Sequence, residues 1–138
     1  TSLFKDVQLR EGTILVQAFG QEGGLTGRPV WVGEFLDGKT TTHMLARLFP
    51  ISREAAGYLF AFLSSDAGYQ QVRVLPFGGS IPHFSEAGIG AVLVPMLDKK
   101  ERANISATVL RALDARDRAL DMELKARQMV EKAIEENA

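Results

Sequence analysis

Few side chains in this sequence could perform acid–base, nucleophilic or metal chemistry. The two histidines, His43 and His83, are far apart in the chain, and there is no cysteine. No cluster of His, Asp and Glu has metal-ligand spacing, and no Gly-x-Ser-x-Gly elbow occurs. The glycine-rich run at residues 20–27 lacks the Gly-Lys-Ser/Thr ending of a phosphate loop and precedes a predicted strand. We therefore expect a protein that is not an enzyme and that holds neither a metal nor an organic cofactor.

Three carboxylates, Asp114, Asp117 and Asp121, fall on one flank of a predicted helix, with arginines interleaved between them. Opposite charges three or four residues apart on a helix surface form ion pairs. We expect a solvated ion-pair face here, not a catalytic carboxylate pair.

Neither the first nor the second part of the chain has the excess of positive charge expected of a segment that binds nucleic acid. The net charge is −1 for the whole chain. Residues 1–97 carry seven Lys/Arg against eight Asp/Glu, and residues 98–138 carry nine of each. A domain that binds nucleic acid on its own usually has a basic excess. No apolar run is long enough for a transmembrane helix, and we expect a cytoplasmic protein without a membrane partner.

The chain divides into two parts of different texture. All 13 glycines, all five prolines and every aromatic residue lie in residues 1–97. Residues 98–138 have none of these and predict one long helix that begins after the N-cap residue Asp98. We expect a globular domain over residues 1–97 and a spacer or dimerisation helix over residues 98–138.

The globular part predicts an α+β fold, a small twisted β-sheet with short helices. Residues rich in β-branched side chains predict strands at 13–19, 29–35 and 40–49, and a short buried strand at 91–94. The turn Asp37-Gly38 ends the second of these strands. Ser52 is placed to cap a helix over 53–63, and the run Ser64-Ser65-Asp66 to cap a shorter helix through Val72.

The long helix carries a repeating apolar face. What we call the alanine seam consists of Ile105 and, one heptad later, a run spaced alternately by three and four residues: Ala112, Ala115, Ala119, Met122, Ala126, Met129 and Ala133. This spacing is typical of a coiled coil, and small side chains allow close antiparallel packing. Such a helix spans roughly 60 Å, whereas a domain of this size has a radius of gyration near ~13 Å. It must therefore project, and we expect a partner helix in the same protein or in a second copy.

Four blocks resemble the specificity subunits of type I restriction–modification systems. Their ranges are 12–24 (Gly-Thr-Ile-Leu-Val, then Gly20 and Gly24), 41–50 (Thr-Thr-His-Met-Leu-Ala-Arg-Leu-Phe-Pro), 58–69 (Tyr-Leu-Phe-Ala-Phe-Leu-Ser-Ser, then Gly-Tyr) and 79–95 (Gly-Ser-Ile-Pro-His-Phe, ending in Leu-Val-Pro). The blocks occur in the family's order, and a long helix follows them as it does in the family.

The resemblance implies a target-recognition domain that reads one half of a split DNA target. It also implies that the long helix pairs antiparallel with a second one and sets the spacing between the two half-sites. The expected partners are double-stranded DNA and a modification subunit that methylates adenine, together with a second half or a second copy that pairs through the helix.

A module of this kind brings loops and strand ends to the major groove, where Arg can pair with guanine and Gln with adenine. The resulting candidates for DNA contact are Gln21, Arg28, Lys39, Thr41, Thr42, His43, Arg47, Ser80 and His83. Each also has an interpretation as surface or turn structure; in particular, Ser80 and His83 can stabilise their own loop through local hydrogen bonds.

Three functions remain open from the sequence. The first is DNA recognition, and the second is a truncated dimerisation or scaffold module with little DNA binding of its own. The third is an unrelated small-molecule-binding domain with a pocket near Trp31. Convergence of Arg28, Lys39, Arg47 and Arg73 on one face with His43 would favour DNA recognition. Dispersal of these cations would favour the scaffold, and a closed apolar cavity would favour small-molecule binding.

Overall fold

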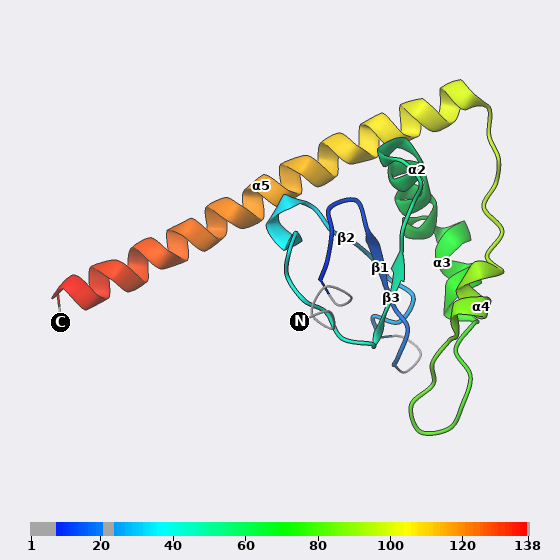
Figure 1. Cartoon of the computed structure of the whole chain (residues 1–138), viewed down its shortest axis with the longest axis horizontal. Helices are drawn as coiled ribbons and strands as arrows, with labels where there is room; N and C mark the ends of the chain where they lie inside the picture. The colour runs from blue at the N-terminus through cyan, green and yellow to red at the C-terminus, as the bar shows by residue number, and fades with distance from the viewer. Residues whose placement is uncertain (1–7, 21–23, 138) are drawn as a thin grey trace.

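The computed structural model describes residues 8–20 and 24–137. Within them the fold is α+β, as the sequence predicts: a small antiparallel sheet, short helices and a long C-terminal helix (Figure 1). The elements are β1 (Ile14–Gln17), β2 (Pro29–Trp31), the 3-10 helix η1 (Glu34–Leu36), β3 (Leu45–Leu48), α2 (Arg53–Ser64), α3 (Asp66–Arg73), α4 (Glu86–Gly90) and α5 (Lys99–Asn137).

Strand β1 lies at the centre of the sheet, in the order β2-β1-β3, and Ile14 is opposite both Trp31 and Leu48. Both of its faces are buried, because Ile14 and Val16 join the main core while Leu15 joins a smaller cluster with Val32. An unbroken apolar run, without polar alternation, is the pattern of such a strand.

Side-chain caps begin the helices where the sequence predicts them. The Ser52 hydroxyl accepts a hydrogen bond from the Ala55 N–H at 3.1 Å, and the Ser65 hydroxyl accepts one from Gly68 at 3.2 Å. The Asp98 carboxylate accepts from the N–H groups of Lys100 and Glu101 at 2.8 and 3.0 Å. Each cap satisfies amide groups that the first turn leaves without an intrahelical acceptor.

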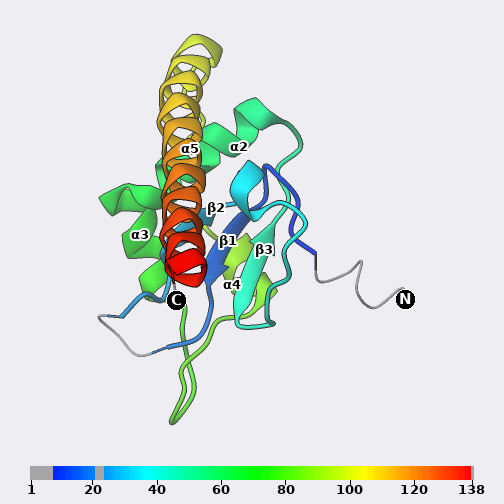
Figure 2. The ribbon, with the colours of Figure 1, turned by 90° about the vertical axis from the view of Figure 1, so that its left-hand side faces the viewer.

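Helix α5 packs against α2 and η1 along its first half and then continues past the globular part (Figures 1 and 2). Leu113 belongs to the main core, and Ser106 is buried beside Gly57 of α2. The core therefore extends past residue 97, where the composition of the chain changes, into the helix. The projection of the helix beyond the domain is confirmed. No helix among the described residues has the length and apolar character needed to cross a bilayer.

The predicted strand at 91–94 is wrong. This segment is an extended link after α4, and Leu93 is 79 % exposed. The side-chain amide of Gln71 accepts from the Leu93 N–H at 2.9 Å and donates to its carbonyl at 3.1 Å. A glutamine from α3 thus satisfies the backbone groups that a neighbouring strand would otherwise bind. The strands predicted at 29–35 and 40–49 exist but are shorter.

Candidate nucleic-acid interface

A hollow of about 670 Å³ lies between β3, the segment before it and α4. Four predicted DNA contacts, Thr41, Thr42, His43 and Arg47, line this hollow together with Phe19 and Phe49. The first three lie in the loop that leads into β3, and Arg47 is on the strand itself, where its side chain is exposed. The structure therefore brings a run of hydroxyl, imidazole and guanidinium groups to one accessible surface.

Phe19 connects the two histidines that are far apart in sequence. The His83 ring stacks on Phe19 with centroids 5.0 Å apart and an angle of 11° between the planes. The His43 ring meets Phe19 edge-on at 5.9 Å. Phe77 extends the row, since its ring lies 5.4 Å from that of His83. We call Phe77, His83, Phe19 and His43 the aromatic row.

Backbone bonds hold the loop at 74–84 in this position. Phe77 and His83 exchange two N–H to carbonyl hydrogen bonds of 2.9 and 3.0 Å, and Gly20 donates to the Pro82 carbonyl at 3.1 Å. Gly78 has φ of +115°, a value that L side chains rarely adopt, so the tight return of the loop depends on glycine there. Ser80 is exposed and lies in the loop between the paired residues Phe77 and His83.

The remaining candidates do not join this surface. The Arg28 guanidinium lies 4.1 Å from the centre of the Tyr69 ring on α3, a cation–π contact. Lys39 lies 4.0 Å from the Phe35 ring, in a different cleft beside α5. Gln21 lies outside the described residues. Of the four cations expected to converge with His43, Arg47 lines the same hollow, whereas Arg28, Lys39 and Arg73 do not.

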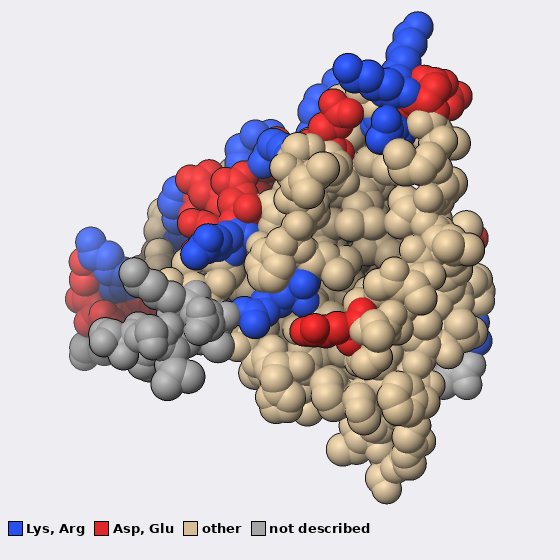
Figure 3. Space-filling model, turned by 45° about the vertical axis from the view of Figure 1, so that its right-hand side comes forward, with Lys and Arg blue, Asp and Glu red and all other residues tan. Residues whose placement is uncertain are grey.

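Charge is distributed unevenly over the surface. In Figure 3, lysine, arginine, aspartate and glutamate gather along α5, whereas the lower part of the face is almost free of charge. Residues 74–84 carry no charged side chain, although Phe77 and Ile81 are more than half exposed. DNA affinity depends largely on cations that neutralise phosphates. This loop can therefore contribute apolar and hydrogen-bonding contacts but no charge neutralisation.

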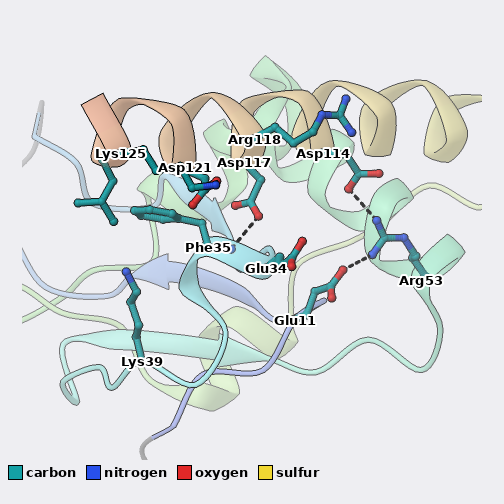
Figure 4. Close-up of a pocket in the computed structure, with 11 residues that line it drawn as sticks. Glu11, Glu34, Phe35, Lys39, Arg53, Asp114, Asp117, Arg118, Asp121 and Lys125 are labelled. Atoms are coloured by element: carbon teal, nitrogen blue, oxygen red, sulfur yellow. Dashed lines mark hydrogen bonds and ion pairs between the residues drawn. The ribbon is translucent and has the colours of Figure 1, made fainter. Parts of the chain in front are cut away.

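A second cleft, of about 720 Å³, lies between η1 and α5 (Figure 4). The Asp117 carboxylate accepts the Phe35 N–H at 2.7 Å, and the Arg53 guanidinium donates to Glu11 and Asp114 at 2.7 Å each. Glu11, and to a smaller extent Asp114, raises the pKa of Arg53 above its ordinary value. The ion-pair face predicted for this flank of α5 is wrong for Asp117, which accepts a backbone N–H of η1. Asp114 does form a half-exposed ion pair, but with Arg53 of α2 and not with an arginine of its own helix.

The cleft beside η1 is lined largely by charged side chains. Its acidic and basic groups are mixed, and among the described residues no three His, Asp or Glu side chains are grouped as metal ligands. Lys125, at its edge, pairs with Asp121 at 2.6 Å on the same helix. The arrangement is that of a joint between two parts of the fold.

The alanine seam lies on the side of α5 that faces away from α2 and η1. From Ala112 onward its residues are exposed, whereas Ile105, near the start of the helix, is half-buried. Met122 and Met129 are 69 % and 72 % exposed. The seam is therefore accessible to a partner, and its pairing remains a prediction.

Sequence reasoning missed Phe19, Phe77 and the contact between Asp117 and Phe35. Phe19 is the last residue of the strand predicted at 13–19, and nothing in the residues next to it marks it as part of a site. Its role depends on loop contacts with residues more than sixty positions later, for which the local pattern has no signal. Trp31, which the small-molecule alternative would place at a pocket, is buried against Phe60.

No family model matches the chain, and no curated protein matches it either.

Proposed function

We propose that this chain is a DNA target-recognition module without catalytic activity, one half of a type I restriction–modification specificity subunit that directs an adenine methyltransferase. The observation that supports this most is the gathering of Thr41, Thr42, His43 and Arg47 on one accessible hollow, with His83 joined to it through Phe19. The resemblance of the four sequence blocks, in order, points to the same function.

The chemistry of this surface suits base edges. A guanidinium can donate two hydrogen bonds to guanine O6 and N7, and threonine hydroxyls can donate or accept with any base. Imidazole offers both a donor and an acceptor. Hydroxyl and imidazole groups at a loop that leads into an exposed strand would read bases, whereas phosphate contacts would come largely from other subunits.

In this proposal α5 is the spacer. Its seam pairs with the long helix of a second half or a second copy, and a modification subunit joins the assembly in the cytoplasm. A recognition domain with so few convergent cations would bind DNA weakly alone, because each phosphate contact contributes to affinity. Binding therefore depends on the assembly.

The scaffold is the second candidate, and one observation favours it. Arg28, Lys39 and Arg47 are dispersed over different parts of the molecule, as expected of a domain that does not bind DNA itself. In that case the chain would contribute only its long helix.

Selection from a randomised duplex pool at low salt tests the proposal, with the chain alone and with a type I modification subunit. We expect enrichment of a short motif with the subunit present, weakened by added salt. The variant His43→Ala/Arg47→Ala should lose the motif. Its matched control, Lys39→Ala, removes a cation outside the hollow and should keep it. A lack of enrichment under both conditions, with helix pairing intact, would establish the scaffold instead.

A further inference from the structure

Beyond the domain, α5 presents an apolar face that nothing else in the described residues covers. Met122, Met129 and Val130 are each more than half exposed. At 100° per residue, Met122 lies opposite the buried Leu113 on the helix, so its face points away from α2. An apolar face of this kind on a projecting helix is built to pack against another helix.

A row of cations runs beside the alanine seam. Arg111, Arg118, Lys125 and Lys132 follow one another at seven-residue intervals, and all four are exposed. We call them the basic row. In heptad terms they flank the seam on one side, at the position where side chains of a paired helix come within reach. Lys125 and Lys132 also pair with Asp121 and Glu136 along their own helix, at 2.6 and 3.5 Å.

Two copies of α5 could pair antiparallel with good packing in one register. It sets Ala119 against Met122 and Ala112 against Met129 of the second copy, a small side chain against a large one each time. On the flank away from the basic row, Arg116 then faces Glu123 of the second copy. This gives two attractive pairs across the dimer, one from each copy.

The same register brings the basic rows of both copies together. Arg111 then faces Lys132 of the second copy and Arg118 faces its Lys125, which makes four contacts between like charges across the dimer. Like charges at flanking positions of a coiled coil select against a pairing. Four repulsive contacts outweigh the two attractive ones, so this helix is suited to a different partner.

We propose that α5 selects a helix other than its own copy: an antiparallel amphipathic helix with a small apolar seam and with Asp or Glu at the positions facing the basic row. The inference rests on the proposed pairing role of α5 and is independent of DNA binding. It decides between the two partners that the sequence leaves open, in favour of a separate second half. The charges of the basic row give this choice its specificity.

The chain itself can supply a substitute partner. The acidic-row variant keeps the alanine seam and reverses the charge of the basic row. It carries the four changes Arg111→Glu/Arg118→Glu/Lys125→Glu/Lys132→Glu. We expect wild type and acidic-row variant to form a 1:1 pair at least about tenfold tighter than either chain forms alone, measured by sedimentation equilibrium. Added salt should reduce this preference, because exposed charges are screened.

Two controls separate charge from packing and from folding. Ala119→Glu, placed in the acidic-row variant, should abolish the mixed pair because it puts a charge into the seam. If the fourfold variant loses helix content by circular dichroism, Arg111→Glu/Arg118→Glu leaves the pairs Lys125–Asp121 and Lys132–Glu136 intact. In the same register this variant sets its two new carboxylates against Lys125 and Lys132 of its own second copy, so it should self-associate more tightly than wild type does.

Wild type that self-associates as tightly as the mixture would overturn the inference while leaving the pairing role of α5 in place. No association in any combination, with helix content retained, would overturn both the inference and the pairing role. Neither result depends on the DNA selection, so the two tests fail separately.

Discussion

The backbone N–H of Phe35 donates a hydrogen bond to the carboxylate of Asp117, 2.7 Å away and 82 residues later in the chain. This bond ties η1 to the middle of α5 (Figure 4). Together with the packing of α2 against α5, it holds the first half of the helix to the domain.

Removal of the carboxylate should weaken the fold. Asp117→Ala leaves the Phe35 N–H without its acceptor, and we expect the free energy of unfolding to fall by about 1–3 kcal/mol. The control is Asp121→Ala, one turn later, where an exposed ion pair with Lys125 is lost and the cost should stay below about 1 kcal/mol. Both substitutions raise the intrinsic helix propensity of α5 by the same amount. The difference between their free energies of unfolding in urea therefore measures the contact of Asp117 with Phe35. Equal effects would argue against it.

Gly33 should be coupled to the same carboxylate. A Cβ at this position would lie 2.7 Å from the Asp117 Cγ, although the Gly33 backbone is extended and open to any residue. Gly33→Ala should therefore destabilise the wild type but cost much less in an Asp117→Ala background. A double-mutant cycle should give a coupling of about 0.5–3 kcal/mol, and additive effects would show that the contact is loose.

The approach of α2 to α5 depends on Gly57. A Cβ there would meet the Ser106 hydroxyl and lie 2.9 Å from the Leu110 Cγ. Overpacking of this kind costs about 1–3 kcal/mol, against about 1 kcal/mol gained by replacing a helical glycine with alanine. We expect Gly57→Ala to lower the melting temperature. Gly90→Ala in α4, where the added Cβ meets open space, should leave it unchanged or raise it.

The aromatic row predicts a specific pattern of ring shifts. Phe19→Leu removes the ring between His43 and His83, so the imidazole proton resonances of both should move in NMR spectra. Phe77→Leu removes a ring that contacts His83 and not His43, so it should shift only the imidazole resonances of His83. Shifts at both histidines in the Phe77 variant would mean that the loop as a whole has rearranged.

The start of α5 should respond to acid. Hydrogen bonds from the backbone of Glu101, and also of Lys100, lower the pKa of Asp98 below its ordinary value. Because the pKa is lower in the folded than in the unfolded state, the Asp98 cap stabilises the helix fully at pH values above the unfolded-state pKa. This stabilisation is lost as the pH falls through the folded-state pKa. The amide shifts of Lys100 and Glu101 should follow that titration. Asp98→Asn keeps an acceptor and should make both amide shifts independent of pH in this range.

The sequence predicted the elements that depend on neighbouring residues. Ser52, Ser65 and Asp98 begin helices because a side-chain oxygen satisfies nearby amides, and the absence of Gly and Pro after Asp98 permits the long helix. The strand predicted at 91–94 is absent because the Gln71 side chain, 22 residues away, hydrogen-bonds the backbone N–H and carbonyl of Leu93.

The candidate site shows the same division between local and distant contacts. Thr41, Thr42, His43 and Arg47 are close in sequence and do share one hollow. The approach of His83, the separation of Lys39 and the anchoring of Asp117 all depend on the way distant segments pack, which no periodicity encodes.

The half of α5 that follows Asp117 projects from the joint between this helix and η1, and we call that joint the fulcrum. Twenty residues separate this aspartate from Asn137, a length of about 30 Å along the axis at 1.5 Å per residue. A tilt of about 10° at the fulcrum would therefore displace the far end by about 5 Å, more than one base-pair step of DNA at roughly 3.4 Å. If α5 is the spacer proposed above, a tilt of this size would be large enough to change the number of base pairs between two half-sites.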